Sequence, residues 1–432
     1  MDRTIQPEIQ ALKNFHILSP VRTTLPNGVP LTVVNAGEQE VVRMDILFAG
    51  GRWQQSQKLQ ALFTNRMLCE GTQKYTAADR KAATIAEKLD YYGSWLELSS
   101  SSEYAYITVY SLNKYLAKTL EVVESMIKEP VFPEKELHTI LDTNIQQYLV
   151  NTSKVDFLAH RGLLQALYGT QHPCGQIVVE EDYHAITPEV LRDFYGRHYH
   201  SGNCSIFLSG KVTEDIIRRV TGAFGTPFGQ YQLKASKPIF SFVAVPEKRI
   251  FIEREDALQS AVKMGCTTIT RQNPDYLKLR VLMTLFGGYF GSRLMSNIRE
   301  EKGYTYGISA GIMFYPDSGL LGISTETDNE YVEPLIQEVY NEIDKLHREP
   351  VPMEELTMVR NYMLGEMCRS YESPFSLADA WIFIATSGLD DQYFSRSLQA
   401  VNEVTPQEIQ ELAQRYLCKE TLKEVIAGKK LS

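Results

Sequence analysis

Two side chains in the second half of the chain, Arg299 and Tyr306, are hydrogen-bond donors of types that could bind one ligand together. They lie seven residues apart, and we expect Arg299 to end a helix and Tyr306 to begin a strand, so that both can point into one cleft. A guanidinium group offers a fixed fork of N–H donors, and a phenol adds a neutral O–H donor. The simpler alternatives are that Arg299 pairs with Glu300 or Glu301 and that Tyr306 belongs to the core.

The side chains that commonly bind metals are too scattered to predict a metal site. The chain has eight histidines but no pair with H-x-x-x-H spacing, and its six cysteines include no C-x-x-C pair. His198 and His200 lie close together near a predicted helix end, where we favour a packing or capping role over a metal role. Such cysteine spacing is typical of reduced, mostly buried thiols. The cysteines are Cys69, Cys174, Cys204, Cys266, Cys368 and Cys418.

The size and charge of the chain exclude several classes of protein. With 432 residues the chain is too long for one ordinary core, which predicts two or three domains. A formal net charge of −9 repels a phosphate backbone, so we expect no nucleic-acid partner. The sequence has no apolar run of membrane-spanning length and begins without the apolar core of a signal peptide. We therefore expect no membrane association and a cytoplasmic location.

The order of the predicted elements occurs twice along the chain. In each half, apolar periodicity and capping residues predict strands, helices, two further strands, long helices and a last strand. One helix is expected to run from a cap at Thr76 to Tyr92. The stretch from Phe224 to Pro246 is rich in glycine and proline and has no helical period, which indicates a linker. We predict an α+β fold with two similar domains, each a mostly antiparallel sheet covered by helices: an N-terminal domain (1–224), a linker (225–246) and a C-terminal domain (247–432).

The segment from Leu59 to Thr72, LQALFTNRMLCEGT, resembles the zinc-binding helix of the pitrilysin / mitochondrial-processing-peptidase family of inverted zincins. In that family the helix carries H-x-x-E-H and ends in a hydrophobic-basic-Gly-Thr turn, which the letters MLCEGT resemble. Counting back from this turn places the first zinc histidine at Leu62. It places the glutamate at Asn65 and the second histidine at Arg66.

These replacements remove the chemistry of a zinc site. Leu62 has no lone pair, Asn65 cannot act as a base, and Arg66 puts a permanent cation where a dication would sit. The resemblance places the remaining ligand of the family, a glutamate, at Gln146 or Gln147. A neutral amide is a poor substitute for a carboxylate ligand. We therefore predict that this chain binds no metal and carries no cofactor.

The second half keeps the C-terminal signature of the same family. Residues 287–307 read GGYFGSRLMSNIREEKGYTYG, with a Gly-rich turn, Ser-Arg-Leu and a following Arg-Glu-x-x-Gly-x-x-Tyr. The resemblance implies that Arg299 and Tyr306 reach across a cavity enclosed by the two domains toward a zinc centre. There they would bind the substrate backbone and stabilise the developing oxyanion.

Two further segments resemble parts of this family. The resemblance implies that an edge strand, WLELSSSS from Trp95 onward, pairs with a peptide, with Trp95, Glu97 and Ser99 as substrate-binding residues. An ordinary strand and loop explains this segment equally well. The loop at residues 172–175, HPCG, resembles a structural loop of the family, and we assign it no chemistry.

Together the resemblances predict the non-catalytic, substrate-binding subunit of a two-chain zinc metallopeptidase. The partner would be a zinc-motif paralogue with an intact H-x-x-E-H, and it would carry the zinc. This chain would supply Arg299 and Tyr306 for peptide hydrolysis and would be inactive alone. The alternatives are an inactive homologue acting as a structural or assembly subunit, or a peptide-binding homodimer. An active peptidase with rearranged ligands would need a metal for which the sequence offers no ligands.

Overall fold

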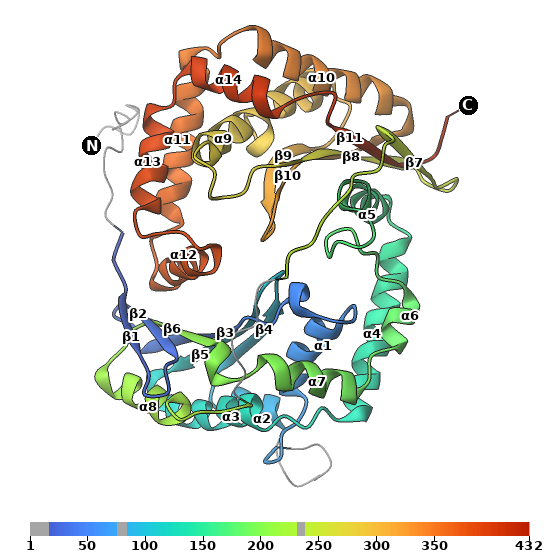
Figure 1. Cartoon of the computed structure of the whole chain (residues 1–432). Helices are drawn as coiled ribbons and strands as arrows, with labels where there is room; N and C mark the ends of the chain where they lie inside the picture. The colour runs from blue at the N-terminus through green and yellow to red at the C-terminus, as the bar shows by residue number, and fades with distance from the viewer. Residues whose placement is uncertain (1–16, 76–83, 231–237, 432) are drawn as a thin grey trace.

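Two similar halves make up the molecule, one above the other in Figure 1. The computed structural model describes residues 17–75, 84–230 and 238–431. The predicted helix cap at Thr76 lies outside the described residues. The helix expected there begins at Ile85, and the Thr84 side chain accepts a hydrogen bond from the backbone N–H of Glu87.

The first half contains a six-stranded sheet with the order β1-β2-β6-β3-β5-β4. The β2 and β6 strands pair in parallel, and the other neighbouring strands are antiparallel. The central strand β3 is buried on both faces, as its apolar sequence VVRMDILF favours. The strands are β1 (Val21–Thr24), β2 (Pro30–Asn35), β3 (Val41–Phe48), β4 (Trp95–Ser100), β5 (Ala105–Leu112) and β6 (Cys204–Gly210).

The second half repeats this topology in a five-stranded sheet with the order β7-β11-β8-β10-β9. Its parallel pair is β7 and β11, which correspond to β2 and β6, and its edge strand β9 corresponds to β4. The α+β fold with a tandem duplication, predicted from the order of elements, is confirmed. The strands are β7 (Arg249–Glu253), β8 (Gln259–Thr268), β9 (Ile308–Phe314), β10 (Gly319–Asp328) and β11 (Lys423–Gly428).

Helices cover the outer faces of both sheets and bury their apolar sides against them (Figure 1). No helix within the described ranges is long and apolar enough to cross a membrane. The first half contains α1 (Gln60–Arg66), α2 (Ile85–Tyr91), α3 (Leu116–Lys128), α4 (Glu134–Thr152), α5 (Val155–Tyr168), α6 (Glu180–His184), α7 (Pro188–His198) and α8 (Glu214–Phe224). The second half contains α9 (Tyr276–Met283), α10 (Val332–Arg348), α11 (Met353–Arg369), α12 (Pro374–Ser387), α13 (Tyr393–Glu403) and α14 (Pro406–Tyr416).

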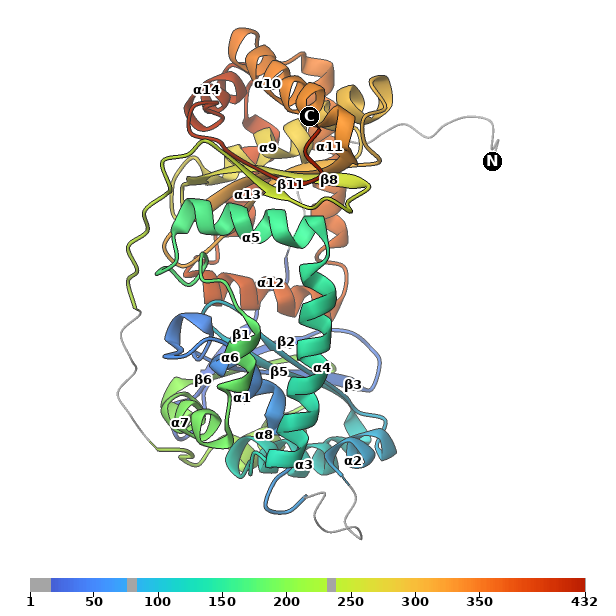
Figure 2. The ribbon, with the colours of Figure 1, turned by 90° about the vertical axis from the view of Figure 1, so that its right-hand side faces the viewer.

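One helix of each half packs on the sheet of the other half (Figure 2). The α5 helix lies on β8 and β11, where Leu163 shares a core with Val425. The α12 helix lies on β6 and β2, where Ile382 contacts Phe207. Gly162 allows the close approach of α5, because a Cβ there would lie 2.9 Å from Cγ1 of Val425. The predicted boundaries at residues 224 and 247 stay a prediction. The α5 helix of the first half packs on the second sheet, and the α12 helix of the second half packs on the first sheet.

Buried polar contacts also join the two halves. The Arg43 guanidinium on β3 lies 2.8 Å from the Asp45 carboxylate and 2.6 Å from that of Asp379 on α12. His172, which follows α5, is fully buried, and its Nε2 lies 3.0 Å from a carboxylate oxygen of Asp317 between β9 and β10. This contact agrees with the structural role assigned to the HPCG loop.

Candidate functional site

The α1 helix carries the three residues that stand at the zinc-ligand and base positions. Asn65 is buried, with 1% of its surface exposed. Its Nδ2 donates to the backbone oxygens of Ser99 on β4, at 2.7 Å, and of Tyr106 on β5, at 3.2 Å. Its Oδ1 accepts a hydrogen bond from the Tyr199 hydroxyl at 3.2 Å. The asparagine at the position of the general base therefore ties α1 to the sheet.

Arg66 reaches α4, the helix on which the resemblance places the third zinc ligand. Its Nη1 donates to Oδ1 of Asn144 at 2.7 Å. The residues predicted at this place, Gln146 and Gln147, are both exposed, and Gln147 bonds Asn151 on its own helix. On α4 it is thus Asn144 that contacts Arg66, and the assignment of Gln146 or Gln147 to the position of the glutamate ligand stays a prediction. The α4 group beside the degenerate motif is still a neutral amide.

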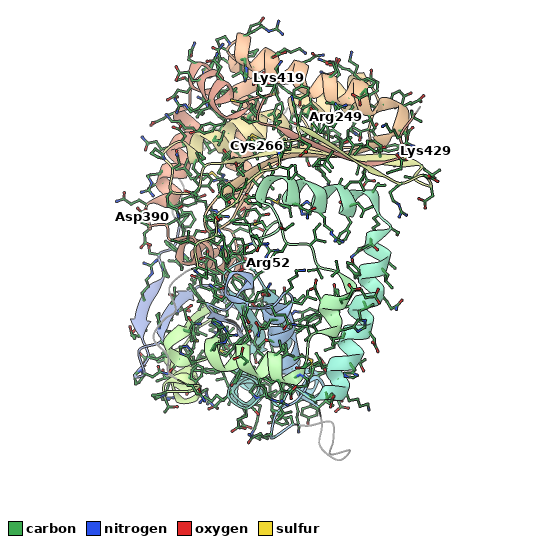
Figure 3. The ribbon with its side chains drawn as sticks, turned by 45° about the vertical axis from the view of Figure 1, so that its right-hand side comes forward. Arg52, Arg249, Cys266, Asp390, Lys419 and Lys429 are labelled. Atoms are coloured by element: carbon green, nitrogen blue, oxygen red, sulfur yellow. The ribbon has the colours of Figure 1, made fainter. Side chains whose placement is uncertain are left out.

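A cavity of about 450 Å³ opens beside Leu62. Its walls include Arg52, Lys58 and the serine run at 100–102. Figure 3 labels Arg52 where the two halves approach each other. Lys58 is paired with Asp182 at 3.0 Å. The wall offers hydroxyl and cationic donors that suit peptide carbonyl groups.

The side chains at the three motif positions of α1 do not fit a zinc ion. Leu62 offers no ligand atom, Asn65 is hydrogen-bonded to backbone, and Arg66 carries a positive charge. Within the described ranges, no group of three or more His, Cys, Asp or Glu side chains is placed to hold a metal ion.

His198 and His200, the histidine pair of the sequence, lie at the end of α7 and just beyond it. The His198 ring packs on Phe194 with a centroid distance of 4.4 Å and is 6% exposed. Burial, with a smaller contribution from the positive charge of Arg197, lowers the pKa of His198 to about 4. These contacts agree with the packing role favoured for His198.

The β4 strand lies at the edge of the first sheet. It pairs with β5, and no described strand pairs with its other side. Trp95, Glu97 and Ser99 are exposed and alternate along it with half-buried residues, so their side chains share one face. The strand therefore has the open edge that pairing with a peptide requires, while the role of these three side chains stays a prediction.

Arg299 and Tyr306 are brought together by the structure. The Arg299 Nε donates to the backbone oxygen of Tyr306 at 3.1 Å, and the guanidinium lies 4.6 Å from the centroid of the Phe290 ring. Its Nη1 also forms a long ion pair with Glu300 at 3.8 Å, as the simpler alternative for Arg299 predicted. Tyr306 is 93% exposed, so the alternative that it belongs to the core is wrong.

The elements around this pair differ from the sequence prediction in detail. Arg299 lies in a widened helical turn, Met295–Glu301, and the left-handed Gly303 reverses the chain after it. Because β9 begins at Ile308, Tyr306 lies in the loop before the strand.

Threonine hydroxyls fix the loop that carries Tyr306. The Thr305 Oγ1 donates to the backbone oxygen of Glu326 on β10 at 2.7 Å, and the Thr325 Oγ1 donates to that of Gly307 at 2.8 Å. Both threonines are buried. The backbone on either side of Tyr306 is therefore anchored to β10 while its ring projects into solvent. The sequence signal for these hydrogen bonds was the alternation of Thr325 and Thr327 on one face of β10, and it was not recognised in the sequence.

Comparison of the chain with known proteins identifies its family. Residues 34–176 match the family described as Insulinase (Peptidase family M16), and residues 185–363 match the Peptidase M16 inactive domain. The chain belongs to the M16 peptidase family, as the two motifs predicted. It is thus an M16 homologue whose residues 185–363, from α7 of the first half to α11 of the second, match the inactive domain.

Individual relatives agree with this assignment. An uncharacterized zinc protease of Bacillus subtilis, YmxG, is 24% identical over 361 residues, which cover 82% of this chain and 84% of that protein. An uncharacterized zinc protease of Rickettsia felis is 23% identical over 83% of this chain and 84% of its own length. A peptidase M16 inactive domain from Pseudomonas fluorescens superposes with a TM-score of 0.82 at 23% identity, covering 96% of this chain and 99% of that one. A protease from Helicobacter pylori gives a TM-score of 0.85 at 15% identity, covering 96% and 100%.

Proposed function

We propose that this chain is the non-catalytic, substrate-binding subunit of an M16 zinc metallopeptidase and supplies Arg299 and Tyr306 to a zinc-bearing paralogue for peptide hydrolysis. The observation that carries this proposal is the exposed, anchored Tyr306 beside Arg299. An exposed aromatic ring is unremarkable alone, but here the flanking backbone is held by buried hydroxyl groups. The arrangement suits a ring that contacts a partner or a peptide.

The α1 helix supports a division of labour between two chains. Asn65 and Arg66 are engaged by the sheet and by α4, and Leu62 offers no ligand atom, so these three positions of α1 do not suit a metal ion. The zinc of the partner would activate water and polarise the scissile carbonyl. The proposal thus expects zinc in the partner and none here.

The donors of this chain would act on the substrate carbonyl as its oxygen becomes negative. The Nε of Arg299 is used by the Tyr306 backbone, and within the described ranges neither Nη group has a hydrogen-bond partner. The Phe290 ring supports the guanidinium plane. A guanidinium fork and a phenol held in place stabilise a developing oxyanion without reorganising in the transition state.

The peptide would lie in extended form along the open edge of β4. Backbone pairing with this edge would supply affinity with little dependence on sequence, and Trp95, Glu97 and Ser99 would contact alternate side chains. Ser102 of the adjoining cavity offers a further hydroxyl group. The cytoplasmic location expected from the sequence belongs to the same proposal.

The proposal is tested by the peptidase activity of this chain mixed with a zinc-motif M16 homologue from the same source. Arg299→Ala and Tyr306→Phe should each lower kcat about 100- to 1,000-fold, as expected for the loss of one oxyanion donor. Circular dichroism and urea unfolding should show both variants folded, since both side chains lie at the surface.

Matched control variants remove the same groups elsewhere. Tyr91→Phe on α2 changes a tyrosine that is 82% exposed, and Arg218→Ala on α8 changes an arginine whose side chain is 75% exposed. Both should leave kcat unchanged. Full activity of the mixture with Arg299→Ala and with Tyr306→Phe would contradict the catalytic role and leave the scaffold or peptide-binding alternatives.

A further inference from the structure

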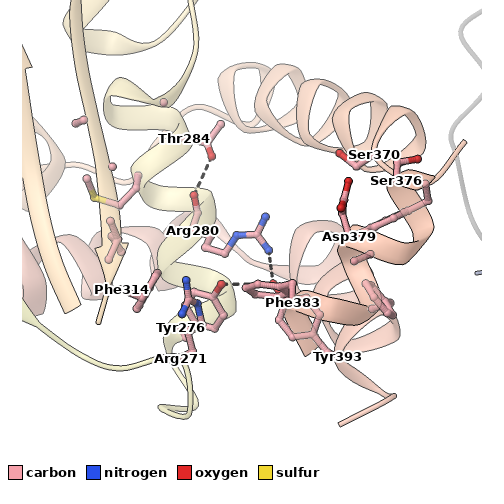
Figure 4. A pocket seen from close by; sticks show the side chains of 18 residues that line it. Arg271, Tyr276, Arg280, Thr284, Phe314, Ser370, Ser376, Asp379, Phe383 and Tyr393 are labelled. Carbon is pink, nitrogen blue, oxygen red and sulfur yellow. Dashed lines mark hydrogen bonds between the residues drawn. The ribbon is translucent and has the colours of Figure 1, made fainter. Parts of the chain in front are cut away.

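A second and larger cavity lies wholly within the second half. Its volume is about 740 Å³, within the range of small-ligand sites. It is bounded by α9, the edge strand β9, the end of α11, α12 and the start of α13 (Figure 4). Neither Arg299 nor Tyr306 lines it, so it is separate from the proposed catalytic pair.

Two arginines line this cavity without an acidic partner. The Arg280 Nη1 donates to the Tyr393 hydroxyl at 3.0 Å and to the Ser397 hydroxyl at 3.3 Å. The Arg271 guanidinium lies 4.6 Å from the ring centroid of Phe314 and 5.2 Å from that of Phe383 on α12. Across the described ranges neither arginine forms an ion pair with a carboxylate. Both therefore keep N–H donors for a ligand.

The one acidic side chain in the cavity wall does not neutralise them. Asp379 pairs with Arg43 of the first half at 2.6 Å. In Figure 4 it lies on the α12 side, apart from Arg280. The cavity thus has a surplus of positive charge in a chain whose net charge is −9. Charge complementarity points to an anion.

The rest of the wall suits an extended chain with an apolar side chain. Four residues of β9 line the cavity, and a Cβ added at Gly311 would meet no atom within 4 Å, so space is open above this edge strand. No described strand pairs with the free side of β9. The remaining lining is mainly aromatic and aliphatic and includes Tyr276, Met283, Phe383, Tyr393 and Phe394.

We propose that this cavity binds the C-terminal residue of a peptide. Arg271 and Arg280 would bind the α-carboxylate, and the aromatic wall would bind an apolar or aromatic last side chain. The peptide backbone would leave the cavity along the edge of β9. The inference goes beyond the proposed function, because it concerns a separate site on this chain and requires no partner and no catalysis.

Fluorescence anisotropy with the full chain alone tests this proposal. The probes are two hexapeptides labelled at the N-terminus and ending in Phe, one with a free carboxylate and one with a carboxamide. The free acid should bind at least about tenfold more tightly, which corresponds to about 1.4 kcal/mol. Arg271→Gln and Arg280→Gln should each abolish this preference. Arg271→Gln is the cleaner variant, because within the described ranges its guanidinium makes no hydrogen bond.

Three controls separate this site from other binding. Arg218→Gln removes an exposed arginine on α8 and should keep the preference for the free acid. Tyr306→Phe should also keep it, so that failure of the catalytic proposal and failure of this one are distinguishable. Inorganic phosphate should displace the peptide only at concentrations far above the peptide Kd. Equal binding of acid and amide, no binding of either, a preference that survives both cavity variants, or displacement by equimolar phosphate would each overturn the proposal.

Discussion

Replacing Asn65 by aspartate tests the role of this residue most sharply. The change is nearly isosteric, and it replaces the Nδ2 donor by an oxygen that can only accept. The Nδ2 donor faces two backbone oxygens, at 2.7 and 3.2 Å. Asn65→Asp would turn a buried carboxylate toward these oxygens with no compensating charge. The loss of a buried partner of this kind costs about 3–5 kcal/mol. Asn65→Ala removes three hydrogen bonds without adding charge and should cost about 2–3 kcal/mol.

The assay is urea unfolding at pH 7.5 and pH 5, followed by circular dichroism. Burial and the two oxygens would raise the folded-state pKa of the new aspartate above that of the unfolded chain. The penalty is therefore present above the folded pKa and should ease as pH falls, because the protonated acid can donate again. Asn144→Asp is the matched control. Asn144 is half-buried, accepts from Arg66 and donates to the backbone oxygen of Ile140 on its own helix at 2.7 Å. The new carboxylate would lose that donor but gain an ion pair with Arg66, so stability should change by less than about 1 kcal/mol. Equal stability of Asn65→Asp and Asn144→Asp at pH 7.5 would refute the reasoning.

Two further predictions concern the stability of the fold. The pKa of His198 is lowered to about 4 in the folded chain, whereas it is about 6.5 in the unfolded chain. Between these pH values the unfolded chain binds a proton at His198 and the folded chain does not. The free energy of unfolding should therefore fall by about 2 kcal/mol between pH 7 and pH 5, and urea unfolding of His198→Phe should lose that part of the pH dependence. Gly162→Val on α5 should destabilise the chain by about 1–3 kcal/mol more than Gly196→Val on α7, because a Cβ at Gly162 meets Val425 whereas one at Gly196 meets no atom within 4 Å. Equal effects of the two valines would show that α5 is not closely packed on the second sheet.

Local patterns sufficed to predict the duplicated fold and the two motifs. Strand alternation and helix caps act over a few residues, and the same order of elements occurs in both sheets. The prediction that α1 lacks the usual zinc chemistry depends on the identity of Leu62, Asn65 and Arg66 and needs no tertiary contact.

Contacts between distant segments could not be predicted in the same way. The packing of α5 on the second sheet and of α12 on the first sheet could not be predicted from either helix sequence. An apolar face shows that a helix is packed against something, but it does not show against which sheet. The contact of Arg66 with Asn144 on α4 could not be predicted for the same reason. The cavity around Arg271 and Arg280 is likewise made by elements that are far apart in the chain.

The central claim is that this chain carries no metal and works only with a zinc-bearing partner. The most direct measurement is the zinc content and peptidase activity of the purified chain, alone and then mixed with a zinc-motif M16 homologue from the same source. We predict neither zinc nor activity in the chain alone, and activity in the mixture. Stoichiometric zinc with peptidase activity in the isolated chain would contradict the account.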